Sequence, residues 1–232
     1  MKQWVPSLAW LYRKPGRRKR RAFKASPPVI LSGGFACLIL LGTLLLKIPG
    51  ATEQPITWLE SLFTATSAVT VTGLVVVDTG ATYSVFGLTV LAVLIQAGGL
   101  GFMTFAVLAA MSLGGHVGLQ HQLMAKEAMH QTSLANIGRT AKAVVSLALT
   151  VEAVAVVGLT LTWWGDKGFV DALSEAVFYA ISAFNSAGFV LSPNGLVDYA
   201  SSIPVNLIVS ILFVIGGLGF SVITNIAEKR RW

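Results

Sequence analysis

Four long apolar runs alternate with shorter polar segments along this chain. They cover residues 28–48, 83–111, 143–164 and 203–224, and they contain only two charged side chains, Lys47 and Glu152. A helix needs about 20 apolar residues to cross the hydrocarbon core of a bilayer, and each run is long enough. The pattern therefore predicts an all-α integral membrane protein with four spanning helices.

Composition supports the same class of protein. The chain has 232 residues, of which 54% are hydrophobic and 12% are charged. Soluble domains carry about 25% charged residues, so a soluble protein is excluded at this stage. No phosphate-binding loop or pair of nucleophile and base is found, and we therefore expect no enzyme activity and no cofactor.

Charged residues are distributed unevenly and predict an orientation. Nearly half of the 17 basic residues lie in residues 13–24, directly before the first apolar run. Lysine and arginine collect on the cytoplasmic side of membrane proteins, so both termini are predicted to be cytoplasmic in a multi-pass protein of the plasma membrane. With that topology only Lys47 and Lys167 are basic residues on the outer side, where seven of the ten acidic residues also lie.

The sequence contains an internal repeat. "ESLFTATSAVTVTGL" at 60–74 matches "EAVFYAISAFNSAGF" at 175–189 in six of 15 positions, and "GGLGF" occurs at 98–102 and again at 216–220. Both copies begin and end on the inner side, which predicts parallel repeats. We expect a basic segment at 1–26, a first repeat at 27–115, a cytoplasmic connection at 116–138 and a second repeat at 139–228.

A short helix is expected between the two spans of each repeat. Pro55 can start the first, and Asp171 is a suitable N-cap for the second. Each is about 13 residues, or roughly 20 Å, which is too short to cross a bilayer and suits a re-entrant pore helix. The polar stretches that follow, "TVTG" and "NSAG", are predicted to line an aqueous path, because irregular backbone at membrane depth must face protein or water.

These stretches resemble the filters of the Trk/Ktr/HKT superfamily of potassium transport proteins, and the chain is most similar to its Ktr-type membrane subunits. The resemblance rests on "FTATSAVTVTGLVVVDTG" at 63–80, "SAFNSAGF" at 182–189 and the GGLGF motifs, and it runs from about 27 to 228. It implies an ion-conducting pore subunit that binds K⁺ through filter backbone oxygens. The implied ion-binding residues are Thr70, Val71, Thr72, Gly73, Asn185, Ser186, Ala187 and Gly188. Gly73 favours potassium, since plant relatives that transport sodium carry serine there.

The family has four such repeats around one pore, whereas this chain has two. The chain is therefore either the N-terminal half of a longer protein or one of two copies that complete a pore. The resemblance implies further partners: membrane lipid, a homodimer of complete subunits, and a cytoplasmic, nucleotide-binding regulatory ring of the KtrA type. Nucleic acid is not expected as a partner. A non-conducting scaffold, an incomplete subunit and a sodium-conducting member of the family remain as alternatives.

Three further features have open interpretations. Glu152 lies near the middle of the third run, where an acid is a functional candidate, a partner of polar backbone, or a protonated group at a helix interface. The GGLGF glycines fit close packing against the pore helices better than a hinge. His116, His121 and His130 lack the spacing of metal ligands on one helix face, so no transition-metal site is predicted.

Overall fold

The computed structural model describes residues 27–101 and 137–218, and all regular elements in these ranges are helices. In chain order they are α1 (Pro27–Leu46), α2 (Trp58–Val69), α3 (Thr79–Thr82), α4 (Val85–Gly99), α7 (Ile137–Lys167), α8 (Phe169–Phe184), the 3₁₀ helix η3 (Val197–Tyr199) and α9 (Ile203–Gly217). The extended pairing found in the described residues is one isolated bridge, between Thr52 and Tyr83. The predicted all-α class is therefore confirmed.

Each predicted spanning run coincides with a helix, namely α1, α4, α7 and α9. Among the described residues, one helix is both long and apolar enough to cross a membrane, at Lys142–Lys167 within α7. The other three runs form shorter apolar helices, at Ser32–Leu46, Val85–Gly99 and Ile203–Gly217. The remainder of the second and fourth runs, from residues 102 and 219 onward, lies outside the described residues.

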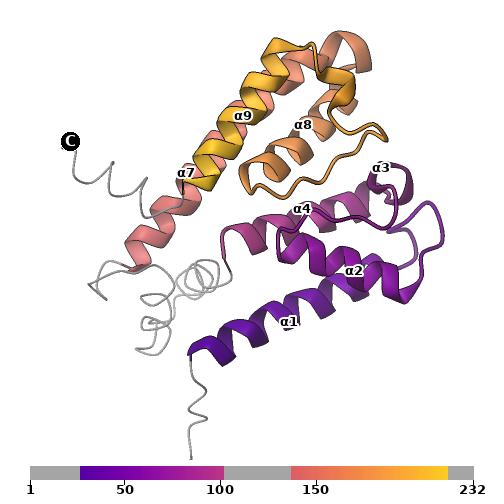
Figure 1. Ribbon diagram of the computed structural model, residues 1–232, viewed down its shortest axis with the longest axis vertical. Coiled ribbons are helices and arrows are strands. Elements are labelled where there is room, and N and C mark those ends of the chain that lie inside the picture. Colours follow the sequence, from indigo (N-terminus) through magenta and orange to yellow (C-terminus); the bar gives the residue numbers. More distant parts are fainter. Residues whose placement is uncertain (1–26, 102–136, 219–232) are drawn as a thin grey trace, which may run out of the picture.

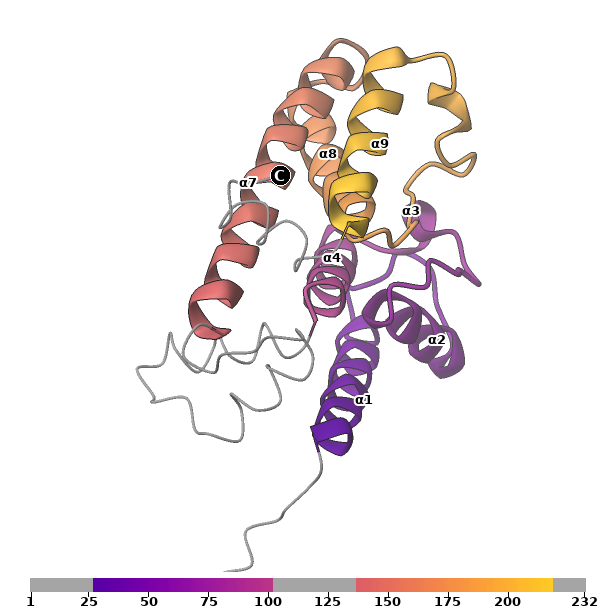
Figure 2. The ribbon, with the colours of Figure 1, turned by 60° about the vertical axis from the view of Figure 1, so that its left-hand side comes forward.

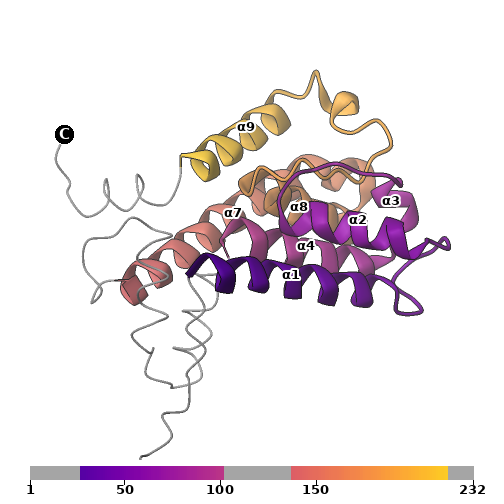
Figure 3. The same ribbon diagram turned by 60° about the horizontal axis from the view of Figure 1, so that its bottom comes forward.

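The helices form two groups that follow the order of the chain (Figure 1). Helices α1, α2 and α4 pack on one another, and so do α7, α8 and α9. The groups are joined where α4 packs against α8. Figure 2 shows α8 beside α7 and α9, and Figure 3 shows α2 beside α1 and α4. Each group therefore holds one predicted pore helix against the helices of two predicted spanning runs.

The short helix α2 begins later than predicted. Thr57, not Pro55, precedes its first turn and forms a capping box with Glu60, in which each residue's side chain bonds the backbone N–H of the other. These hydrogen bonds satisfy donors that a helix start otherwise leaves free. The pKa of the Glu60 carboxyl is lowered, mainly because the carboxylate accepts a hydrogen bond from the backbone N–H of Thr57.

The short helix α8 begins earlier than predicted. Its N-cap is Gly168, with φ +81°, and Asp171 lies inside the first turn. The predicted capping role of Asp171 is therefore wrong: α7 continues to Lys167, so the chain must turn within a single residue, and glycine adopts that φ without strain. Asp171 still lies where a negative charge is favourable to the helix dipole.

A lysine at the end of the first helix in each group holds the adjacent short helix. Lys47 donates to the carbonyl of Ile56, at 2.6 Å, and its ammonium lies 5.3 Å from the Trp58 ring centre. Lys167 pairs with Glu175 of α8 and lies over the rings of Trp163 and Tyr199. The two lysines therefore tie each short helix to the helix that precedes it.

Candidate functional site

The two candidate stretches, 70–73 and 185–188, directly follow α2 and α8 and have the same backbone conformation. Val71 and Gly73 have φ of +54° and +76°, and the corresponding Ser186 and Gly188 have +57° and +73°. Val71 and Ser186 are the only non-glycine residues with positive φ in the described ranges. A bulky residue rarely adopts this conformation, and strain of this kind concentrates at functional sites.

Hydrogen bonds that hold the two stretches correspond one to one. The N–H groups of Thr70, Val71 and Thr72 donate to carbonyls of α2, over 2.9, 3.2 and 2.9 Å. The N–H groups of Asn185, Ser186 and Ala187 donate to carbonyls of α8, over 3.1, 3.0 and 2.8 Å. In each stretch, three consecutive donors are thus turned back onto the preceding helix.

The carbonyl oxygens of the stretches are left without such partners. In residues 27–101 and 137–218, no hydrogen bond ends on a main-chain oxygen of either stretch. Of the eight residues only Ala187 is buried, so these oxygens are open to bind water or an ion. The eight carbonyls also follow the ends of two helices that each carry roughly half a negative charge. This chemistry suits a cation.

The two stretches approach each other at Gly73. A Cβ built on Gly73 would lie 2.2 Å from the carbonyl oxygen of Ala187 and 3.5 Å from the Cα of Gly188. Only a hydrogen fits in this space, so the close approach requires glycine in addition to the positive φ. The structure thus brings together the predicted site residues from two parts of the chain that are about 115 residues apart.

A glycine of each GGLGF motif packs behind the end of a short helix. A Cβ on Gly98 of α4 would lie 2.0 Å from the carbonyl oxygen of Val69, and one on Gly216 of α9 would lie 1.7 Å from that of Phe184. Val69 and Phe184 are the last residues of α2 and α8. These contacts agree with the packing interpretation of the motifs. The final residues of both motifs lie outside the described residues.

The side chains of the first stretch are held by local contacts. The Thr70 hydroxyl bonds the Thr66 carbonyl at 2.7 Å and the Thr72 hydroxyl at 2.6 Å. Thr70 and Thr72 are exposed and border an open groove along α2, together with Leu59, Leu62, Phe63, Thr66, Ser67 and Leu74. Within the described ranges, the hydrogen bonds of this stretch stay within it and its own helix.

The second stretch is held by residues from other helices. The side-chain amide of Asn185 donates to Gln96 Oε1 of α4 at 2.8 Å and to the Ile181 carbonyl at 2.9 Å. Gln96 Nε2 in turn donates to both carboxylate oxygens of Glu152 on α7, at 2.9 and 3.1 Å. Gln96 is not among the residues predicted from the sequence, although a lone amide in an uncharged apolar run is a usable signal.

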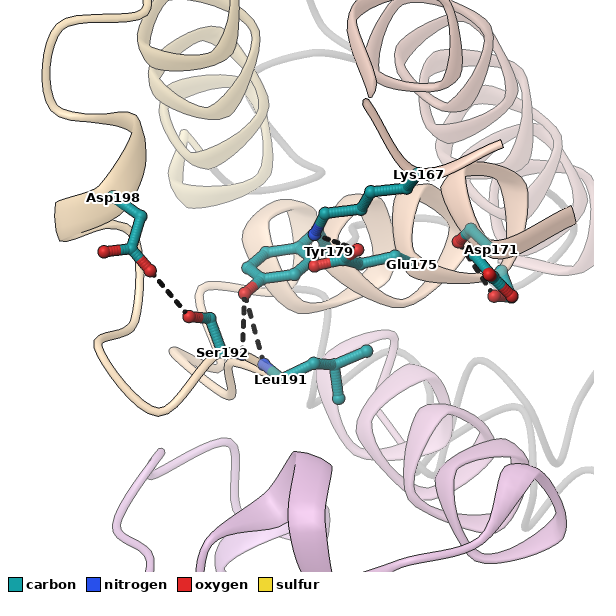
Figure 4. Close-up of polar contacts among 8 residues, drawn as sticks. Lys167, Asp171, Glu175, Tyr179, Leu191, Ser192 and Asp198 are labelled. Carbon is teal, nitrogen blue, oxygen red and sulfur yellow. Dashed lines mark hydrogen bonds and ion pairs between the residues drawn. The ribbon is translucent and has the colours of Figure 1, made fainter. Parts of the chain in front are cut away.

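Further contacts secure the segment that leaves the second stretch. The Ser182 hydroxyl donates to the Phe189 carbonyl at 2.7 Å. Figure 4 shows the Tyr179 hydroxyl, which accepts from the N–H groups of Leu191 and Ser192 at 3.2 and 3.3 Å. In the same view, the Ser192 hydroxyl bonds Asp198 at 3.0 Å. The backbone after residue 188 is thereby fixed to α8 and to the 3₁₀ helix η3.

Two further predictions from the sequence concern Glu152 and the three histidines. Glu152 has a polar partner, but it is the side-chain amide of Gln96 and not the polar backbone expected as one option. His116, His121 and His130 lie outside the described residues. Among the residues that the structure describes, no group of three or more histidine, cysteine or acidic side chains could hold a metal ion.

Comparison with known proteins identifies similar chains. A family model described as TrkH, cation transport protein, matches residues 11–231. Ktr system potassium uptake protein B from Bacillus subtilis is 42% identical over 89% of this chain and 46% of its own length. The protein of the same name from Vibrio alginolyticus is 37% identical over 92% of this chain and 47% of its own. Potassium/sodium uptake protein NtpJ from Enterococcus hirae is 29% identical over 92% and 48%. The chain thus spans about half the length of these relatives.

Proposed function

Because the chain belongs to the TrkH family of cation transport proteins, we propose that it forms part of a potassium-conducting pore. The backbone carbonyl oxygens of residues 70–73 and 185–188 are proposed to coordinate the ion. A pore of this kind is channel-like and driven by ion gradients and the membrane potential. Membership of the family and the apolar helices together place the chain in a membrane.

One observation carries the proposal. The N–H groups at the start of each stretch donate to the preceding helix, and the carbonyl oxygens have no hydrogen-bond partner in the described part of the chain. Rings of carbonyl oxygens replace the hydration shell of K⁺ in selectivity filters. Residues of positive φ alternate with others along each stretch. Such alternation allows successive peptide groups to face one side, whereas a regular strand turns them to opposite sides.

The architecture proposed for the chain is two parallel repeats with re-entrant helices α2 and α8, within the domain boundaries expected from the sequence. Corresponding backbone geometry in the stretches and corresponding glycine contacts at Gly98 and Gly216 support it. Both helices, at 12 and 16 residues, are shorter than a bilayer crossing requires. Cytoplasmic termini and an acidic outer side are part of the same proposal.

Two stretches supply half of a fourfold filter, so we propose that further repeats complete it, from the same protein or from a second copy. The open side of α2 supports this view, because Leu59 is 75% exposed and borders the groove beside Thr70 and Thr72. The end of α9 is also open on one side, because a Cβ on Gly217 would meet no described atom within 4 Å. A dimer of complete subunits and a nucleotide-binding regulatory ring remain proposals from the family resemblance.

The proposal is tested by uptake in bacteria that lack their own potassium uptake and express the full-length protein. Gly73→Ser is expected to lower the preference for K⁺ over Na⁺ by about tenfold or more, since it adds both strain and a clash with Ala187. Gly50→Ser is the matched control: Gly50 has φ +93° and nothing near its Cβ position. If Gly73→Ser leaves both uptake and ion preference unchanged, the filter assignment is wrong.

Sodium transport is the second candidate function. One observation favours it: the name of the relative NtpJ includes sodium beside potassium. The same uptake assay separates the candidates. A potassium pore gives uptake that excess Na⁺ leaves largely unchanged, whereas a pore for both ions gives uptake that Na⁺ suppresses.

A further inference from the structure

A carboxylate is buried within the spanning helix α7. Glu152 is only 5% exposed. Ionisable groups inside membrane proteins are costly, and those that are present have a partner. The one ion pair among the described residues joins Lys167 to Glu175, so Glu152 has no cation beside it there. Its partner is the amide of Gln96, which donates to both carboxylate oxygens.

This pairing determines how the Gln96 amide is oriented. Gln96 Nε2 lies within hydrogen-bond distance of both carboxylate oxygens, so the NH₂ end of the amide faces Glu152 and the amide oxygen is left for another donor. That oxygen accepts from Asn185 Nδ2 at 2.8 Å. The contact crosses from α4 in the first group of helices to the end of α8 in the second. Glu152, Gln96 and Asn185 thus form a directional chain of hydrogen bonds that ends at the second stretch.

The end of this chain lies next to a strained peptide. Asn185 is the C-cap of α8, with φ −80°, and it directly precedes Ser186 at φ +57°. Strained backbone persists only where surrounding contacts over-determine it. The Asn185 side chain is confined on its other side by Gly99, where a Cβ would lie 2.0 Å from Asn185 Oδ1. The hydrogen bonds and the glycine together restrict this side chain to one orientation.

We propose that Glu152 and Gln96 are positioning residues that hold the second stretch in its cation-binding conformation and thereby set its preference for K⁺ over Na⁺. This inference rests on the proposed function, and it adds residues from two spanning helices to the site. Neither residue contacts the ion; both act through Asn185. A residue that only stabilises the fold would change the amount of protein in the membrane and leave the ion preference unchanged.

The test measures ion preference in the full-length protein, as the ratio of K⁺ to Na⁺ uptake per amount of protein in the membrane. The main variant is the double change Gln96→Met and Glu152→Leu, which removes both partners and leaves no unpaired buried charge. We expect the preference to fall by roughly threefold to tenfold, the factor that one hydrogen bond is typically worth. Glu152→Gln keeps an acceptor for Gln96 and should stay within about twofold of the original preference.

Thr160→Val is the matched control on the same helix. Thr160 is buried, and its hydroxyl has no hydrogen-bond partner in the described part of the chain. The ion preference of this variant should not change.

If the double variant does not accumulate in the membrane, Gly99→Ala is the second test, because it displaces the Asn185 side chain without altering the carboxylate. Gly165→Ala, where a Cβ meets nothing within 4 Å, is its control.

Two results would overturn the inference. One is an unchanged ion preference in the double variant or, where that variant is absent from the membrane, in Gly99→Ala. The other is a Glu152→Gln variant that loses preference as strongly as the double variant, which would make the charge, and not the positioning, responsible. If Gly73→Ser alters the preference while these variants do not, the inference fails alone. If Gly73→Ser also has no effect, the proposed function fails.

Discussion

The stretches at 70–73 and 185–188 share a backbone conformation and differ in what supports it. Corresponding residues have φ within a few degrees, since Val71 and Ser186 are at +54° and +57°. The hydrogen bonds of the first stretch stay within it and its own helix, whereas those of the second reach Gln96 of α4 and, through it, Glu152 of α7. The same main-chain geometry is therefore combined with different side-chain contacts in the two stretches.

The largest expected effect concerns the glycines of the two stretches. Gly73→Ala should lower the rate of potassium uptake by about tenfold, because its Cβ, like that of Gly73→Ser, meets both a positive φ and the Ala187 carbonyl oxygen at 2.2 Å. Gly188→Ala should retain more uptake, since its Cβ would be 3.9 Å from the nearest atom, the Cα of Gly73, and only the strain of roughly 1–2 kcal/mol remains. Initial rates of uptake, corrected for protein amount, measure both. Equal loss in the two variants would contradict the asymmetry described at this contact.

Much of the fold was accessible from the sequence. Span length and low charge predicted α1, α4, α7 and α9, because burial in a bilayer imposes a strong constraint on composition. The match between 60–74 and 175–189 predicted that two short helices would be followed by similar polar stretches. That similarity extends to hydrogen bonds: Thr72 and Ala187 bond α2 and α8 through the same spacing.

Some features were missed. The N-cap at Thr57 has a local signal, because Thr57 and Glu60 have the spacing of a capping box, whereas the N-cap at Gly168 depends on where α7 ends, at Lys167. Gln96 was missed because its role depends on Asn185, which is 89 residues away. Local propensity carries no information about such a partner.

An intermediate effect is expected at the glycines behind the short helices. Gly98→Ala and Gly216→Ala each place a Cβ within about 2 Å of a main-chain oxygen, of Val69 and Phe184 respectively. Main chain cannot rotate away, so each variant should lose roughly 1–3 kcal/mol of stability. Thermal unfolding in detergent should show similar decreases in Tm for both, and none for Gly165→Ala. A neutral result for either one would mean that the two halves are not packed alike.

The smallest effect should come from an identical pair of serines, Ser67 and Ser182, which lie at corresponding positions of α2 and α8. Ser182 donates to the Phe189 carbonyl, whereas the buried Ser67 hydroxyl has no hydrogen-bond partner among the described residues. Ser182→Ala should therefore cost about 1 kcal/mol and lower the Tm by a few degrees, because it leaves a buried acceptor unpaired. Ser67→Ala should be neutral or slightly stabilising, since it removes a buried polar group that gains nothing. The same Tm measurement in both variants tests the difference. Equal decreases would mean that the Ser67 hydroxyl has a partner in the full-length protein, and the first stretch would then depend on contacts beyond its own helix, as the second does.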